Sequence, residues 1–516
     1  MAFAVLPDEY KMMLLLVLTT LLLVFLGVLY VISKIKKNQT KYLQNIPGPK
    51  PIFPFGNTLD FIKGSTVFLD VVVNYLRKYG DTIVVHDSLF SWILLSVDYD
   101  FNEMIYNSSI HIEKSVQYDF LHGWLGQGLL TTTGDKWKSH RKIITPAFHF
   151  SILQEFLHVF DSVGNNLIKK IRKEVGNTSF EISNLMSLFA LDVICETAMG
   201  TKINALDSTS PENSDYVRSI KIMCAILIER TFSLVPPSFY HLTLNYYREK
   251  RALKIIHSHV DSIIEKRLQS RKNNEQFNDK LTDNNFKTKK AFLDLLLDAR
   301  IDGREFTKTE LRDEVNTFMF EGHDTTSSAL TFTILMLATH PKVQEKAFNE
   351  QKSIFAFSEN IKEVKASGAQ LSQMKYLEMV IKETLRLYPT VPIYGRKISK
   401  DVEFKGSVIP KGINVTLCPY VCHRKALYFE NPEEFIPERF ETLTGKLPFS
   451  YTPFSAGLRN CIGQKFAMME LLCTVSKILR NFELSPAFPE HKLQIVAESI
   501  LISKNGVKIS VHERNV

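Results

Sequence analysis

The chain has 516 residues, of which 45% are hydrophobic, and this length allows a sizeable buried core. Its six cysteines lack a regular spacing, which excludes a disulfide scaffold and favours a reducing compartment. The net charge of +8 indicates an acidic partner or an anionic membrane face and carries no information about the fold.

The first predicted element is an uncharged apolar segment, residues 12–32. At the rise of an α-helix it spans roughly 30 Å, the thickness of a hydrocarbon core. A cleaved signal peptide would have a shorter apolar region and a small-residue cleavage site, and neither is apparent. Lysines follow the segment at 34, 36, 37 and 41, whereas only Lys11 precedes it. The positive-inside rule therefore predicts a signal anchor with residues 1–11 in the lumen and the rest in the cytosol.

The remaining chain divides into a linker and one large body. Residues 33–56 are basic and proline-rich, and the prolines from residue 45 onward exclude a helix and favour a stiff connector. Residues 57–516 are expected to form one large cytosolic domain. Apolar residues recur at helical spacing over 251–271, 310–339, 374–388 and 463–482. The short runs T-I-V-V-H-D and W-I-L-L-S-V suggest a minor sheet, so the fold class is mainly α with a small β-rich region.

Two segments are defined by composition alone. Residues 230–247 are aromatic-rich and broken by proline, which fits either core around a tight turn or a loop that dips into the membrane. Residues 270–290 are strongly polar, and we expect them to form a solvated loop.

Residues 314–332 contain a local conflict. Asp324 and Thr325 are poor helix formers in the middle of an apolar helical run, and such conflicts are expected at functional sites. The alternative interpretation is that the Thr325 hydroxyl bonds to the carbonyl of Glu321. Helical spacing places Glu321 and Thr325 on one face, where an unpaired buried carboxylate would be costly.

Two further pairs of residues occur at helical spacing. Trp137 and Arg141 are four residues apart, and Glu383 and Arg386 are three apart, so each pair shares a helix face. By itself the Glu383–Arg386 pair is typical of a surface ion pair, which contributes little to stability, and Arg141 is typical of a surface charge.

The segment P-F-S-A-G-L-R-N-C-I-G-Q-K-F-A-M runs from 453 to 468 and contains Cys461. A lone cysteine is more often a buried hydrophobe than a ligand. Here, however, Gly457 and Gly463 allow tight turns, while a helix start and Arg459 would favour the thiolate.

Residues 454–463 resemble the haem-binding loop of the cytochrome P-450 superfamily, F-x-x-G-x-R-x-C-x-G. The string E-V-N-T-F-M-F-E-G-H-D-T-T resembles the signature of family 4, with Asn316 replacing the usual aspartate. Leu458 stands where that family often has proline. The resemblance implies a cytochrome P-450 fold preceded by one transmembrane helix.

The resemblance assigns expected roles around haem b. Cys461 would be the proximal iron ligand, and its thiolate favours O–O cleavage. Thr325, assisted by Asp324, would deliver protons, and Gly322 would leave room for oxygen. Several family 4 enzymes form an ester to a haem methyl group, and we extend this hypothesis to Glu321. The residues expected to contact the propionates or pack on the haem are Trp137, Arg141, Arg396, Arg459 and Phe454.

Three further groups follow from the family pattern. A buried structural triad is expected from Glu383, Arg386 and Arg439. Substrate contacts are expected from Phe120, Leu121, Leu125, Phe318 and Val391. His323 is expected to point away from the iron, and C-P-Y-V-C-H at 418–423 carries one residue too many for the attachment of c-type haem.

The implied activity is monooxygenation of an apolar substrate, with terminal or near-terminal hydroxylation of fatty acids or related lipids. Electrons would come from NADPH through NADPH–cytochrome P-450 reductase, with cytochrome b5 as an additional donor, on the endoplasmic reticulum membrane. Nucleic acid is not an expected partner. Alternatives are a thiolate-haem isomerase or dehydratase that acts on hydroperoxides without reductase, and a haem sensor or lipid-binding protein without turnover. Two interpretations are open for Lys136, Lys138, Lys142 and Lys465, which fit either a reductase docking patch or a general solvated surface.

Overall fold

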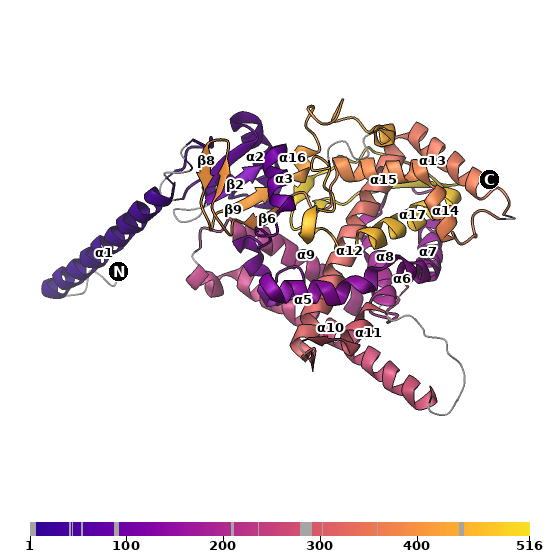
Figure 1. Cartoon of the computed structure of the whole chain (residues 1–516), viewed down its shortest axis with the longest axis horizontal. Coiled ribbons are helices and arrows are strands. Elements are labelled where there is room, and N and C mark those ends of the chain that lie inside the picture. The colour runs from indigo at the N-terminus through magenta and orange to yellow at the C-terminus, as the bar shows by residue number, and fades with distance from the viewer. Residues whose placement is uncertain are drawn as a thin grey trace.

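A computed structural model describes residues 7–40, 43, 45–52, 55–86, 92–207, 211–235, 237–278, 291–301, 303–358, 360–442 and 448–515. The chain begins with helix α1 (Asp8–Thr40), which projects away from the body (Figure 1). Its stretch Glu9–Val31 has a mean hydropathy of 2.9, and none of it is buried. Among the described residues this is the one straight helix that is long and apolar enough to cross a membrane. The helix continues to Thr40, so the expected change from anchor to linker at residue 33 is not a helix boundary.

The body is built around helix α12 (Lys308–Thr339), which is buried along almost its whole length. Thr307 and Glu310 form a capping box that starts it. Neighbouring helices α8 (Ser183–Thr197), α10 (Leu244–Asn278), α15 (Lys375–Leu387) and α17 (Gln464–Asn481) pack against it. The four helices expected from apolar spacing are confirmed as α10, α12, α15 and α17. The prediction of a loop at 270–290 is wrong for residues 270–278, because α10 extends to Asn278. Residues 279–290 lie outside the described residues.

The other helices surround this centre and are shown in Figure 1. They are α2 (Ser65–Tyr79), α3 (Tyr99–Asn107), α4 (His122–Leu125), α5 (Gly134–Ile144), α6 (Phe150–Leu153), α7 (Leu157–Arg172), α9 (Pro211–Thr231), α11 (Phe292–Asp298), α13 (Pro341–Ile354), α14 (Gly368–Gln373) and α16 (Pro419–Cys422). A large apolar core runs through them, and a smaller core lies against the main sheet.

The main sheet has four strands in the order β1 (Thr82–His86), β2 (Trp92–Ser96), β9 (Asn414–Leu417) and β6 (Tyr394–Lys397). The strands expected from T-I-V-V-H-D and W-I-L-L-S-V are confirmed as β1 and β2, which pair antiparallel. The sheet lies at the end of the body from which α1 projects (Figure 1). The remaining strands are β3 (Phe180–Glu181), β4 (Arg300–Ile301), β5 (Arg304–Glu305), β7 (Val402–Phe404), β8 (Ser407–Ile409), β10 (Phe482–Pro486), β11 (Ile495–Ala497), β12 (Leu501–Ser503) and β13 (Lys508–Glu513).

Candidate functional site

A cavity of ≈ 340 Å³ lies between α5, α9, α12, the main sheet and the segment that precedes α17. Most of the site residues expected from the sequence line it, although they come from distant parts of the chain. These are Leu121, Trp137, Arg141, Glu321, Thr325, Val391, Arg396, Phe454, Arg459 and Cys461.

The loop that carries Cys461 depends on one glycine. Gly457 has a φ of +68°, and a Cβ added there would lie 1.8 Å from the carbonyl oxygen of Tyr106. The amide of Cys461 donates to the carbonyl of Phe454 at 2.9 Å, which closes the loop before α17 begins. Gly463 has a φ of −87° and a ψ of 7°, a turn conformation that residues other than glycine can also adopt.

Cys461 lines the cavity, so its thiol is exposed to the cavity although protein surrounds the site. Burial, followed by the negative charge of Glu321, raises the pKa of this thiol to about 12. The backbone N–H of Gly463 at the helix start and the charge of Arg141 lower this pKa and so oppose the effect of burial. A metal cation bound at the sulfur would reverse this balance.

One end of the cavity is lined by three arginines, Arg141, Arg396 and Arg459. Arg459 lies over the ring of Trp137 at 4.7 Å and donates to the carbonyls of Leu130 and Thr132, each at 3.0 Å. Arg141 donates to the backbone oxygen and the side-chain oxygen of Asn460, at 3.0 and 2.9 Å. These bonds fasten α5, and the loop between α4 and α5, to the Cys461 loop.

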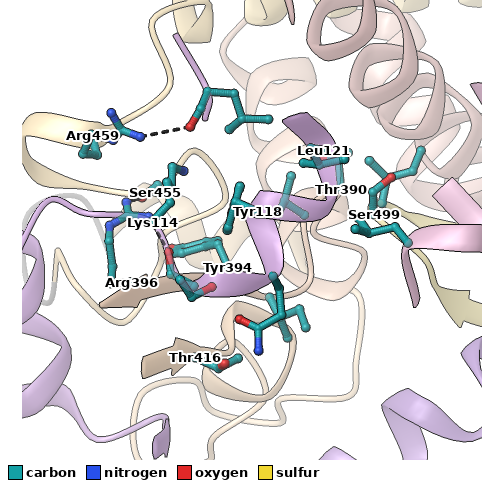
Figure 2. A pocket seen from close by; sticks show the side chains of 18 of the residues that line it. Lys114, Tyr118, Leu121, Thr390, Tyr394, Arg396, Thr416, Ser455, Arg459 and Ser499 are labelled. Carbon is teal, nitrogen blue, oxygen red and sulfur yellow. Dashed lines mark hydrogen bonds between the residues drawn. The ribbon is translucent and has the colours of Figure 1, made fainter. Parts of the chain in front are cut away.

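Lys114 is a fourth cation at this end, and Figure 2 shows it beside Arg396 and Arg459. No sequence motif marks this lysine, and it was missed. Burial, then the charges of Arg396 and Arg459, lowers the pKa of Lys114 well below its usual value. Burial and Arg396 lower the pKa of Arg459 to about 9. Glu321 is the acid that opposes them, so this end carries more buried positive charge than the described protein neutralises.

This surplus is the test of whether the residues fit a haem. A haem presents two propionate carboxylates at one edge, and clustered guanidinium groups bind carboxylates well. The cation cluster, the inward thiol of Cys461 and the apolar wall that includes Phe454 together match such a ligand. The residues present therefore fit a haem.

On α12, Glu321 and Thr325 face the cavity, and the Thr325 hydroxyl donates to the carbonyl of Glu321 at 2.6 Å. The alternative considered from sequence is thus the observed hydrogen bond, and the hydroxyl oxygen can still accept from the cavity side. Asp324 is buried and does not line the cavity. Burial raises the pKa of Asp324 to about 6, while Lys221 and the thiol of Cys224, 3.8 Å away, oppose the shift.

Two neighbours on α12 face the helical core instead. A Cβ at Gly322 would lie 2.6 Å from Ile194 on α8, so this glycine permits close helix packing, and the expectation that it makes room for oxygen is wrong. His323 is buried among the helices and lies outside the cavity lining, as expected. The segment C-P-Y-V-C-H at 418–423 contains the short helix α16 and His423. The ring nitrogens of His423 contact the carbonyl of Arg386 and the amide of Thr452.

The expected triad is assembled in the interior. Arg386 Nε and Nη2 donate to the two oxygens of Glu383 at 2.7 and 2.9 Å, and Arg439 Nε donates to the same carboxylate at 3.0 Å. The amide of Ile436 also donates to Glu383, at 2.8 Å. Arg386 further donates to the carbonyls of residues 423, 432 and 434, so the triad fastens α15 to the segment that follows α16.

Two of the five expected substrate contacts, Leu121 and Val391, line the cavity, and the other three do not. Phe120 lies against the guanidinium of Arg230 at 4.7 Å, and Leu125 is fully buried core. Phe318 shares a helix face with Thr325 but lies about 10 Å away along α12. There it packs on Phe292, with ring centroids 4.2 Å apart.

The cavity wall includes residues that sequence reasoning did not find. Its aromatic part comes from α2 and α12, from two short 3-10 helices (Thr58–Phe61 and Val116–Leu121) and from the residue after α9, and its polar part includes the turn between β11 and β12. These residues are Phe61, Phe68, Phe232, Phe320, Tyr118, Glu498 and Ser499. No motif connects these segments, since only the packing of distant elements brings them together.

A family model for cytochrome P450 matches residues 46–511, a range that contains every residue lining the cavity. Cytochrome P450 4d2 of Drosophila melanogaster is 40% identical over 493 residues, covering 91% of this chain and 94% of that protein. Cytochrome P450 4V2 of Homo sapiens is 41% identical over 420 residues, covering 80% and 79%. Cytochrome P450 4c3 of Drosophila melanogaster is 36% identical over 502 residues, covering 94% and 92%.

Proposed function

This chain belongs to the cytochrome P450 family, whose members are haem-containing monooxygenases, and on that premise we propose that it hydroxylates fatty acids or related lipids at terminal or near-terminal carbons. The observation that carries the proposal is one cavity with a thiol and a cation cluster at one end and an aromatic, aliphatic wall over the rest. The family 4 names of its relatives fit a lipid substrate.

In this proposal Cys461 would supply the thiolate ligand to the iron of haem b. Arg141, Arg396 and Arg459 would bind the propionates beside Trp137, and Phe454 would pack on the ring. When bound, the haem supplies the iron at which dioxygen is activated, so that one oxygen atom enters the substrate and the other becomes water. The aromatic wall holds the apolar chain and excludes bulk water from it.

Thr325 and Asp324 have separate tasks in the proposal. The Thr325 hydroxyl at the cavity surface accepts a hydrogen bond from a group in the cavity while it donates to the carbonyl of Glu321. Asp324, with a pKa raised to about 6, exchanges a proton near neutral pH and resupplies the cavity from behind Thr325.

Replacing Thr325 by valine keeps the shape and removes the hydroxyl. We expect NADPH oxidation to continue while hydroxylated product per NADPH falls about tenfold, because one positioned proton donor is lost. The control is Thr333→Val, since Thr333 makes the same backbone bond (to Ala329, 2.7 Å) but lies in the core. Equal coupling in the wild type and Thr325→Val would contradict the role of this hydroxyl.

Glu321 is proposed to form an ester with a haem methyl group during turnover. The ester would join a carboxyl oxygen of Glu321 to the methyl carbon, with dioxygen as the oxidant. The carboxyl group and the methyl group would each lose one hydrogen, and these two hydrogens with their two electrons would reduce dioxygen to hydrogen peroxide. Glu321 lines the cavity, and burial raises the pKa of its carboxyl, so a neutral ester relieves a desolvated charge.

Acid denaturation after turnover tests this bond. We expect the haem to remain with the wild-type chain and to be extracted completely from Glu321→Ala, measured by chromatography with absorbance and mass detection. Wild-type enzyme that has not turned over serves as the matched control and should release its haem. Free haem from the wild type after turnover would show that no ester forms.

The membrane arrangement is also a proposal. Residues 1–11 would be lumenal, 12–32 would span the endoplasmic reticulum membrane, 33–56 would connect, and 57–516 would face the cytosol. Large apolar side chains between α9 and the start of α10 are exposed, which favours the membrane-dipping interpretation of 230–247 over the core one. They include Leu234, Val235, Phe239, Leu242 and Leu244.

Electron supply is proposed from NADPH–cytochrome P-450 reductase, with cytochrome b5 as an additional donor. Lys136, Lys138 and Lys142 on α5 and Lys465 on α17 are exposed beside the segments that carry Trp137 and Cys461. Such lysines suit an acidic docking partner. An isomerase or dehydratase would not need this partner.

The decisive experiment is incubation of the purified protein with reductase, NADPH and a panel of lipids, followed by mass spectrometry of the products. We expect a hydroxyl group at or next to the chain end, formed only with NADPH. Absence of such a product at every chain length would overturn the lipid hydroxylase proposal, and NADPH-independent turnover of hydroperoxides would favour the isomerase.

A further inference from the structure

The two ends of the cavity differ in charge. In Figure 2, Lys114, Arg396 and Arg459 gather on one side, and Leu121, Thr390 and Ser499 lie on the other. Among the described residues, the lysines and arginines that line the cavity are Lys114, Arg141, Arg396 and Arg459. All of them belong to the end proposed to hold the haem carboxylates. The described cavity therefore has cations that can bind the haem carboxylates. It has no lysine or arginine at the far end that could bind the carboxylate of an acidic substrate.

At the end opposite the cation cluster, the wall is apolar except for a few groups. Phe61 and Phe232 stack with their centroids 4.5 Å apart, and Phe68 packs against Phe232 at 5.3 Å. The turn between β11 and β12 adds Glu498 and Ser499 to this wall. Glu498 is the charged side chain that the far end presents to a substrate.

The position of Glu498 is set by its neighbours. The Ser499 hydroxyl donates to the sulfur of Cys224 at 2.8 Å, and that thiol donates to Asp324 at 3.8 Å. This chain fastens the turn to α9 and α12. The carboxylate of Glu498 has no hydrogen bond or ion pair among the described residues, so its oxygens can accept from a ligand.

The charged groups that face Glu498 are two acids, Asp324 and Glu229, and two lysines, Lys221 and Lys504. Neither lysine lines the cavity. Burial and then the charge of Asp324 raise the pKa of Glu498 to about 7, despite both lysines. A substrate carboxylate near this wall would add another negative charge in a poorly solvated place.

We propose that Glu498 makes the enzyme select lipids whose polar end is a hydrogen-bond donor, such as an alcohol or amide, over free carboxylic acids. The inference rests on the proposed lipid hydroxylase function and narrows its substrate class. A hydroxyl or amide N–H donates to the unpaired carboxylate, and a charge-assisted bond of this kind is stronger than a neutral one. A free acid meets repulsion from the same group.

The test is equilibrium binding of a fatty alcohol and the fatty acid of equal chain length to the holoenzyme. Binding is followed by calorimetry at a pH about one unit above the pKa of Glu498, where this carboxyl is mostly ionised. We expect the alcohol to bind at least about tenfold more tightly than the acid, as repulsion between like charges at low dielectric requires. Glu498→Gln removes the charge and should bring the two affinities within about twofold of each other.

Glu229→Gln is the matched control, because it removes a nearby negative charge from an exposed residue outside the lining. The alcohol preference should persist in this variant. An acid that binds the wild type as tightly as the alcohol, or a preference unchanged in Glu498→Gln, would overturn the inference. Binding is measured without turnover, so a failure to oxidise any lipid would reject the proposed function and leave this result standing.

Discussion

The Cys461→Ala variant is expected to lose monooxygenase activity to background. It should also lose the absorption band of the reduced carbon-monoxide complex that a thiolate ligand produces. Cys461 contributes the one thiol that lines the described cavity, so no other described group can donate sulfur to an iron there. The thiolate's electron donation favours O–O cleavage, and an alanine cannot supply it.

Two controls separate loss of the ligand from loss of the fold. Cys473→Ala, on α17 and outside the cavity lining, should retain the band and the activity. Circular dichroism of Cys461→Ala should match the wild type, because the loop is closed by backbone bonds and by Gly457. A thiolate-type band that survives in Cys461→Ala would refute the assignment of Cys461 as the axial ligand.

Glu383→Ala is expected to lower the free energy of unfolding by about 3–5 kcal/mol, since it leaves two guanidinium groups without their carboxylate. Arg386 is fully buried, and Arg439 is almost so at 8% side-chain exposure. Natural domains are stable by about 5–15 kcal/mol, so this loss would leave little folded protein. Thermal and urea denaturation of the purified variants measure it.

The matched control lies on the same helix. Glu378 pairs with Lys382 at 2.7 Å, and both side chains are about one-third exposed. Glu378→Ala should cost less than about 1 kcal/mol, because solvent already screens this pair. Similar losses in the two variants would mean that the triad is no more than a surface ion pair.

Contacts within one helix or one continuous loop could be predicted from the sequence alone. Glu383 and Arg386 are adjacent on one turn of helix, so their spacing alone places them together. Residues 454–463 form one continuous loop, and the inward position of Cys461 and the turn at Gly457 follow from consecutive residues. The helices at 251–271 and 310–339 have an apolar spacing that no other element reproduces.

For other residues, contacts with a distant part of the chain decided the role, and the position in the sequence did not reveal it. Gly322 lies beside Glu321 in the chain, yet the approach of Ile194 on α8 turns it into a packing residue. Phe318 shares a face with Thr325, but Phe292 covers it. The pKa of the Cys461 thiol likewise depends on two effects, since the helix start at Gly463 lowers it and enclosure by the cavity raises it.

Short motifs in the sequence were enough to identify the apolar anchor segment, the Cys461 loop, the Asp324–Thr325 pair and two members of the triad. Only tertiary packing brings Lys114 into the cation cluster, Glu498 to the far wall, and His140 into a buried 2.6 Å contact with Glu314 that joins α5 to α12. The reason is physical. Periodicity and spacing control contacts within one element, whereas burial and Coulomb interactions depend on which distant elements close around a group.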